Sequence, residues 1–237
     1  MDHLGEFVPF TLAHPAAVLP LRRVLWFPGL VAGSIAPDLP YYLCTGVDGS
    51  LTHSLPGLPV DALFGAILVA VGAMLRGTVS GMLGKAITMS RPRVATAVAA
   101  LVIGAATHLA WDEFTHTDGI AVRHWELLRE SVIGPHRVYN VIGYVSSIGG
   151  MLLLASYAIA WYRRARPITP DPLRAWAIGA LAGIAALTAL YARTDPIARV
   201  SLYDCVRHMT IYAITSAAIG FLLYAVWSQA RRRRVAS

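Results

Sequence analysis

The sequence predicts an all-α fold, a polytopic helical membrane bundle of about five transmembrane helices with short interfacial or re-entrant helices at its N-terminus. Apolar residues make up 56% of the 237 residues and charged residues only 14%, whereas a soluble domain carries roughly 25% charged residues. Five apolar runs approach the roughly 20 residues that a helix needs to cross a bilayer. The basic residues behind the net charge of +7 lie largely between these runs, which is typical of a topology signal and not of a nucleic-acid-binding surface.

Residues 1–57 are apolar but are interrupted by prolines, which prevent a long helix. We expect short helices near Thr11–Val24 and Pro28–Ile35, and then a loop through Pro40 and Gly49. Lipid cannot satisfy the polar backbone groups of such a segment, so it must be covered by protein or lie near the interface. A broken sixth span between Val24 and Leu43 remains an alternative.

The five predicted spans belong to a single membrane-embedded domain over residues 1–237. Residues 58–162 hold the first three spans, and residues 163–237 hold the last two together with a basic tail. Only Pro59 and Asp61 interrupt the first run, near its start. The predicted spans are Leu58–Leu75, Val94–Trp111, Val141–Tyr162, Ala175–Ala192 and Met209–Ser228.

The basic residues predict the orientation of the chain. Residues 76–93, residues 163–174 and the tail from Arg231 together hold 12 of the 20 basic residues, although all three segments are short. Short basic loops stay in the cytoplasm, so we expect the C-terminus there. The segments expected on the outer side are residues 1–57, 112–140 and 193–207.

The strongest local signal is the segment Thr107–His116, which reads THLAWDEFTH. On a helix, His108, Asp112 and His116 share one stripe, because each step of four residues advances about 6 Å along the axis. Imidazole nitrogen and carboxylate oxygen are ligands that suit zinc or a similar divalent ion. The same residue types are also expected where a helix end simply enters water, so the motif alone leaves both interpretations open.

Three further polar residues, His14, Asp38 and His53, stand alone among apolar or turn residues. Each has an ordinary explanation: a helix cap for His14, an Asx-turn for Asp38 and an interfacial position for His53. The charge distribution, however, places all three on the same side of the membrane as the THLAWDEFTH motif. We therefore predict one shared metal site on the outer side.

Other polar residues on this side have less definite roles. Arg199 and Arg207 could meet a phosphate or carboxylate, although interfacial snorkelling explains them more simply. Three pairs could supply ligands or acid–base groups, and a plain surface ion pair is the simpler interpretation of the last. These pairs are Asp118 with His124, His136 with Asn140, and Asp204 with His208.

The motifs resemble those of DUF4184, an uncharacterised family of bacterial membrane proteins, and the resemblance implies a multi-pass protein of the bacterial inner (plasma) membrane. The family is similar to membrane-bound metal-dependent hydrolases (YdjM-like proteins) and, more distantly, to zinc-dependent phospholipase C. Residues 170–237 lie outside the resemblance, which covers roughly residues 8–150. It is carried by PFTLAHPA at 9–16, GSIAPDLP at 33–40, THSL at 52–55 and THLAWDEFTH at 107–116.

The resemblance implies that one or two divalent ions, with zinc as the first candidate, are bound by His14, Asp38, His53, His108 and Asp112. The phospholipase group completes its cluster with a further HxxxE or HxxxD pair. At the matching place this chain has His136 followed by Asn140, which argues against a third ion.

Such a site predicts a metal-dependent hydrolase that acts on a membrane lipid or lipid-linked substrate at the outer face, with His116 or Asp118 as catalytic general base or acid. A non-catalytic metal-binding or interaction protein remains an alternative, as does a metal-dependent lipid transferase or cyclase. A transporter is disfavoured, because the last three predicted spans carry no charged residue.

Overall fold

The computed structural model describes residues 11–43, 45–134, 136–200 and 202–236. Almost all regular structure in this part of the chain is helical, and its two short strands, β1 (Ser131–Ile133) and β2 (His136–Arg137), form one small antiparallel pair. The predicted all-α fold is therefore confirmed. Pro9 and Phe10 of the first motif lie outside the described residues.

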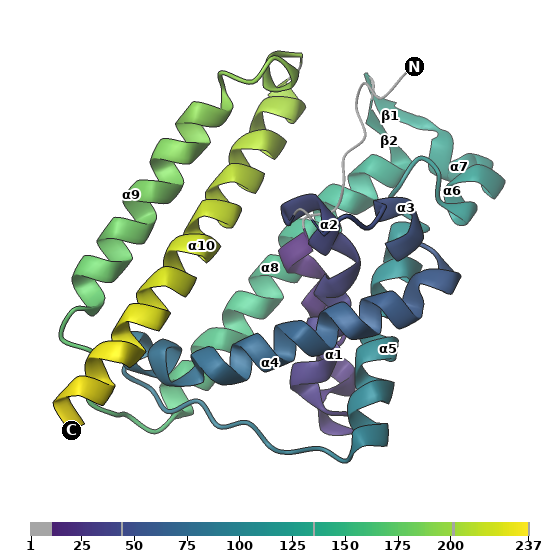
Figure 1. The fold of residues 1–237 in the computed structure, drawn as a ribbon. Coiled ribbons are helices and arrows are strands. Elements are labelled where there is room, and N and C mark those ends of the chain that lie inside the picture. The colour runs from purple at the N-terminus through teal and green to yellow at the C-terminus, as the bar shows by residue number, and fades with distance from the viewer. Residues whose placement is uncertain (1–10, 44, 135, 201, 237) are drawn as a thin grey trace. The chain divides into compact units, whose positions relative to one another are not determined.

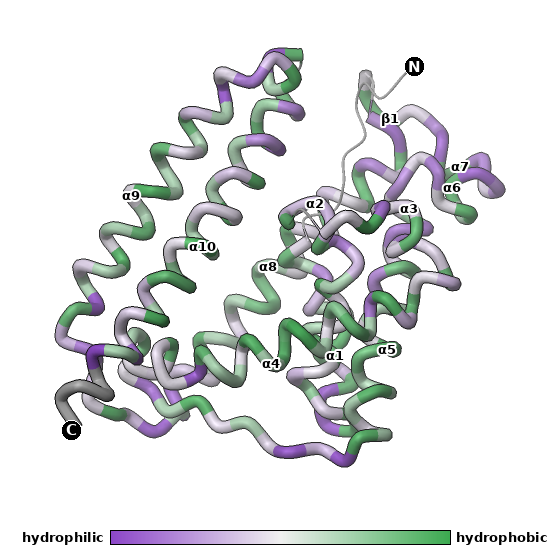
Figure 2. The backbone as a smooth tube through the Cα atoms, viewed as in Figure 1, coloured by the Kyte–Doolittle hydropathy of each residue, from purple (hydrophilic) through white to green (hydrophobic). Residues whose placement is uncertain are grey.

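Five helices are long and apolar enough to cross a membrane, as the sequence predicts. Their exposed surfaces are largely apolar, which is expected of helices that face lipid. Figure 2 shows the hydrophobic residues along these helices and hydrophilic ones gathered around the short helices α6 (Ile120–His124) and α7 (Glu126–Arg129). The five are α4 (Leu58–Leu83), α5 (Val94–Asp112), α8 (Val138–Arg164), α9 (Arg174–Ala192) and α10 (Leu202–Ala236).

The first long helix extends further than the sequence predicts. The apolar run ends at Leu75, but α4 continues through Arg76 to Leu83, because no proline stops it there. Gly84, with φ of 65°, follows its last residue, and a left-handed residue of this kind commonly ends a helix. The connection to α5 is therefore shorter than the predicted basic loop over residues 76–93.

The N-terminal segment is broken into short pieces, as its prolines predict. The predicted helix near Thr11–Val24 is divided in two, and the expected loop through Pro40 and Gly49 contains two further helical turns. Outside this segment, nearer the other end of the chain, a short 3-10 helix, η5 (Ile197–Arg199), precedes α10. The N-terminal pieces are η1 (Thr11–Ala16), η2 (Leu19–Arg23), α1 (Phe27–Ile35), η3 (Ala36–Asp38), α2 (Leu39–Tyr42), α3 (Gly49–Thr52) and η4 (Leu55–Gly57).

The chain divides into two compact units, residues 1–70 with 89–163 and residues 71–88 with 164–237. In the second unit α9 and α10 lie side by side (Figure 1), and the hydroxyl oxygens of Thr188 and Ser216 are 2.7 Å apart between them. The first unit holds all the residues predicted to bind metal. The organisation as one membrane-embedded domain stays a prediction.

Helices α1 and α5 pack unusually closely in the first unit. A Cβ atom at Gly33 would collide with the backbone carbonyl of Leu101, and one at Gly104 would collide with that of Leu30. Small residues of this kind let helix backbones approach each other in membranes. The close approach brings the end of α1 against the second half of α5, where His108 lies.

Candidate metal centre

Five ligand-type side chains from four separate segments converge in the first unit. His14 comes from η1, Asp38 from η3 and His53 from the residue after α3, while His108 and Asp112 lie on successive turns at the end of α5. Apart from the half-buried His53, all are buried. The sequence-predicted residues are thus brought together, whereas their binding of a metal stays a prediction.

Two hydrogen bonds hold the short N-terminal segments in place. The Thr52 hydroxyl, which is fully buried, donates to the carbonyl of Pro37 at 2.8 Å and so places His53 beside Asp38. The hydroxyl oxygens of Thr11 and Tyr42 are 2.8 Å apart, which joins η1 to α2. Side-chain bonds thus give these turns the order that their own short helices cannot supply.

The ligand atoms lie at separations that suit a shared ion. Nε2 of His108 is 3.0 Å from Oδ2 of Asp112 and 3.5 Å from Oδ1 of Asp38. Nε2 of His53 is 3.2 Å from Oδ1 of Asp38 and 3.6 Å from Oδ2 of Asp112, and Nε2 of His14 is 3.7 Å from Oδ1 of Asp112. Ligands about 2.0–2.1 Å from a tetrahedral zinc ion are themselves about 3.3 Å apart. The observed separations bracket that value.

Two histidines present Nε2 to the centre because their other ring nitrogen is occupied. Nδ1 of His108 lies 2.9 Å from the carbonyl of Ser34, and Nδ1 of His53 lies 2.9 Å from the carbonyl of Gly49. A carbonyl can only accept, so each Nδ1 donates. In the neutral imidazole Nε2 then keeps its lone pair, which is the arrangement usual for metal-binding histidines.

Several buried polar atoms of the centre have no hydrogen-bond partner among the described residues. They include Nδ1 of His14, Oδ2 of Asp38 and both carboxylate oxygens of Asp112. Such atoms are costly to bury without a proton, water or cation. Nε2 of His108 is also without a hydrogen bond although Asp112 is only 3.0 Å away. These side chains therefore fit a bound cation better than they fit one another.

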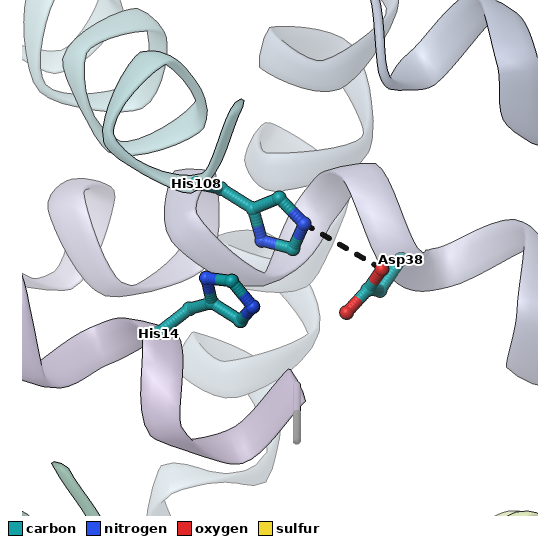
Figure 3. Close-up of side chains that lie close together, drawn as sticks. All are labelled: His14, Asp38 and His108. Carbon is teal, nitrogen blue, oxygen red and sulfur yellow. Dashed lines mark ion pairs between the residues drawn. The ribbon is translucent and has the colours of Figure 1, made fainter. Parts of the chain in front are cut away.

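Figure 3 shows how His14, Asp38 and His108 face each other. The two imidazole rings stack with centroids 3.8 Å apart, and one ligand atom from each of the three residues lies within 4.8 Å of the others. His53, His108 and Asp112 form a second group that meets the same distance limit. The two groups share His108.

Burial and neighbouring charges shift the pKa values of the N-terminal ligands. Burial, and after it the charge of His108, lowers the pKa of His14 to about 4. Burial opposes ionisation of Asp38, but the nearby histidines, His108 foremost, hold the pKa of this carboxyl well below its usual range. A neutral histidine and an ionised carboxylate are the forms that bind a divalent metal.

The centre opens into a cavity of about 1020 Å³ that also contains the predicted catalytic residues. Helix α5 ends at Asp112, so the expected helical stripe does not continue to His116. His116 nevertheless stays close, because its backbone N–H donates to the Asp112 carbonyl and its Nδ1 is 3.6 Å from Oδ2 of Asp112. Polar and apolar side chains share the wall, among them His53, Asp112, His116, Asp118, Phe114 and Trp125.

A family model described as a domain of unknown function, DUF4184, matches residues 8–226. The chain belongs to the DUF4184 family. The match reaches through α9 and most of α10. It therefore extends well beyond residues 8–150, to which the motif resemblance was limited, and the second unit of this DUF4184 protein is part of the family pattern. No curated protein and no solved structure matches the chain. The relation to YdjM-like hydrolases and to phospholipase C stays a prediction.

A second, smaller hollow of about 290 Å³ lies on the other side of His14 in the DUF4184 protein. Its wall consists largely of small residues from η1 and α8, together with His14 and Trp111. A Cβ atom at Gly149 would meet no atom within 4 Å. The candidate centre thus adjoins a cavity of mixed polar and apolar lining and a hollow lined largely by small residues.

The less definite pairs have separate outcomes in the structure. Asp118 and His124 both line the large cavity. Nδ1 of His136 is 3.0 Å from the Tyr144 hydroxyl, and the side-chain oxygen of Asn140 accepts from the backbone N–H of Arg137, so these two residues have different partners. In the second unit, Nδ1 of His208 lies 3.5 Å from the carboxylate of Asp195, a neighbour that sequence spacing does not suggest.

Proposed function

We propose that this DUF4184 protein is a membrane-embedded, metal-dependent hydrolase that acts on a lipid or lipid-linked substrate at the outer face of the membrane. The observation that carries the proposal is the convergence of three histidines and two aspartates with ligand atoms 3.0–3.7 Å apart. The centre would hold one or two divalent ions, with zinc as the first candidate because it accepts both nitrogen and carboxylate ligands.

The chemistry would take place where the centre meets the large cavity. A bound divalent ion lowers the pKa of a water molecule and polarises a phosphoryl or acyl oxygen. Asp112 reaches both the cluster and the cavity wall, and His116 lies beside it. Nε2 of His116 is buried and has no hydrogen-bond partner among the described residues, so it is available to hold or accept a proton. Asp118 is a second acid–base candidate in the same cavity.

The surroundings of the centre favour an amphiphilic substrate. The cavity combines ionisable side chains with large apolar ones such as Phe114 and Trp125. On the opposite side, the hollow beside His14 borders the membrane-spanning helix α8 and would accept part of a hydrocarbon chain. These two environments match the polar and apolar ends of a lipid. A water-soluble substrate would have no use for the second.

Two other functions use the same centre. A lipid transferase or cyclase would differ in what attacks the activated substrate, and its product would show the difference. A non-catalytic metal-binding or interaction protein would need the ion but not the cavity. The cavity beside Asp112 and His116 favours catalysis over this last alternative.

Metal content and lipid turnover test the proposal together. Purified wild-type protein in detergent is expected to retain zinc or another divalent ion, whereas His108→Ala is expected to lose most of it. His208→Ala, which removes a histidine near Asp195 in the second unit, is the matched control. Turnover is followed by phosphorus NMR and mass spectrometry in vesicles of phosphatidylethanolamine and phosphatidylglycerol. Equal metal content in wild type and His108→Ala would remove the proposal.

A further inference from the structure

The chain just before α1 lies at the end of α5 that is far from the metal centre. The indole Nε1 of Trp26 donates to the backbone carbonyl of Ser90 at 3.2 Å. Ser90 lies four residues before α5 begins at Val94, in the connection that follows α4. Helix α5 has 19 residues, so its two ends are about 28 Å apart at a rise of about 1.5 Å per residue. His108 lies near the other end.

Helix α1 lies beside α5 (Figure 1) and follows it from this far end toward the centre. A Cβ atom at Gly29, near the start of α1, would lie 3.0 Å from the side chain of Ala100. Further along both helices, the carbonyl of Ser34 meets the His108 ring. The two helices therefore advance in the same direction, and α1 carries the chain to the end of α5 where the centre lies. Asp38 follows directly after it.

The segment before α1, formed by η1 and η2, passes along α8 away from the centre. A Cβ atom at Gly150 of α8 would lie 3.2 Å from the side chain of Ala13. At the end of η2, the guanidinium carbon of Arg22 lies 5.5 Å from the centroid of the Tyr157 ring. Tyr157 lies about 10 Å further along α8 than Gly150. If α5 and α8 both span the membrane, α8 begins on the side where α5 ends, so this displacement leads toward the opposite side.

The two passages are packed against each other within the protein. Val18 of the first passage, Leu30 of the second and Ala100 of α5 are fully buried in one hydrophobic cluster. Backbone N–H groups donate to the carbonyls of Val18 and Leu21 in the turn that leads from η2 toward α1. Irregular backbone at membrane depth is tolerated where protein covers it and its polar groups are bonded. This packing supplies the cover that such a segment needs.

The turn between the two passages carries side chains that membrane interfaces favour. Arg22 and Arg23 precede Val24, whose side chain is 81% exposed, and Trp26 follows. Arginine is enriched in cytoplasmic loops, and tryptophan in the layer where helices meet lipid headgroups. The bond from Trp26 to Ser90 also places the turn beside the basic connection between α4 and α5. Both observations indicate the side of the membrane opposite the centre.

We propose that residues 15–37 form a re-entrant hairpin. It enters the bilayer on the side of the candidate centre, turns at residues 22–26 among the lipid headgroups of the opposite leaflet, and returns. This differs from the expected topology, in which all of residues 1–57 stay on one side. The hairpin needs α5 and α8 to span the membrane but needs no bound metal. His14 directly precedes it and Asp38 directly follows it, so it connects two candidate ligands with the opposite surface of the membrane.

Cysteine accessibility tests the hairpin in the full-length protein. Cys44 and Cys205 are replaced by Ala, and Val24→Cys, Arg91→Cys or Ser50→Cys is then introduced singly. Each protein is treated with a membrane-impermeant maleimide in sealed vesicles, either right-side-out or inside-out. Val24→Cys and Arg91→Cys are expected to react in the same preparation and to lose the reaction in the other. Ser50→Cys is expected to show the reverse pattern.

Arg91→Cys and Ser50→Cys are the matched references. Both residues are exposed; Arg91 lies in the connection before α5, and Ser50 lines the large cavity beside the centre. Reaction of Val24→Cys together with Ser50→Cys would overturn the hairpin, and so would reaction only after detergent is added, because the turn would then stop within the bilayer. Reaction of both references from one side would overturn it too, since α5 would not cross the membrane. Metal content is measured separately, so failure of the hairpin leaves the proposed function standing.

Discussion

His108 shows how single atoms define the candidate centre. One ring nitrogen meets the Ser34 carbonyl at 2.9 Å, and the other approaches Asp112 at 3.0 Å without a hydrogen bond. The first contact fixes the ring and its tautomer. The second brings two atoms that carry lone pairs close together, which is unfavourable unless a proton or cation lies between them.

Replacing Asp112 by Asn separates metal binding from architecture. Asn retains the size and one oxygen but loses the charge that would balance the ion, so Asp112→Asn is expected to lose most bound zinc while remaining folded. An ion present at 100 times its Kd stabilises a protein by roughly 2.7 kcal/mol. A chelator should therefore lower the thermal midpoint of wild type and leave that of the variant unchanged.

Asp195→Asn provides the comparison, because Asp195 also lies 3.5 Å from a histidine, His208, but in the second unit. Its chelator response is expected to match that of wild type. If Asp112→Asn and wild type respond equally to the chelator, Asp112 is not a ligand.

The sequence predicted the residues of the centre better than their surroundings. Ligand-type side chains such as His108 and Asp38 stand out in an apolar sequence, so their spacing was informative. Asp61 stood out equally in the sequence, but only the structure shows that it is buried. Sequence alone does not tell an inward-facing residue from a lipid-facing one. The Ser34 carbonyl carries no residue-specific signal, so no sequence pattern could assign its bond to His108.

At the scale of elements, the contact between α1 and α5 determines where the ligands meet. Gly33→Val would force a side chain against the Leu101 carbonyl, and overpacking of this kind costs about 1–3 kcal/mol. We expect a lower thermal midpoint in detergent together with weaker zinc binding, since the bond from His108 to Ser34 depends on the same contact. Gly72→Val in α4, where a Cβ meets no atom within 4 Å, is expected to change neither.

The hollow beside His14 gives a separate prediction about lipid. Gly149 lines this hollow, and no atom lies within 4 Å of an added Cβ, so Gly149→Leu would place a bulky side chain there. Less lipid is expected to co-purify with this variant, as measured by mass spectrometry, while its metal content stays that of wild type. Gly179→Leu adds the same side chain to an open position on α9. Equal lipid in all three proteins would mean that the hollow holds no chain.

The sequence predicted which long helices form, but it did not predict where they end. Apolar runs located all five long helices, because length and hydropathy are what a bilayer requires. The predicted end of the first span, at Leu75, was wrong, because the helix continues past Arg76 to Leu83. A charged residue marks where a chain leaves the hydrocarbon region, whereas a helix ends where its backbone hydrogen bonds end.

At the scale of the whole molecule, the distribution of basic residues predicts the orientation of the chain in the membrane. Reporter fusions after Lys85, in the connection between α4 and α5, are expected to report a cytoplasmic location. Fusions at Arg129, in α7, are expected to report the outer side. The reverse result at both positions would place the metal centre at the cytoplasmic face and change the lipids it can reach.

Three of the four segments that supply the candidate ligands are short helical turns or lie directly beside one. Short turns such as η1 and η3 are held mainly by their neighbours. An ion bound to His14, Asp38, His53 and His108 would act as a removable cross-link, closing loops whose ends the unfolded chain rarely brings together. The protease sensitivity of residues 11–57 would then report whether the ion is bound, without any knowledge of the substrate.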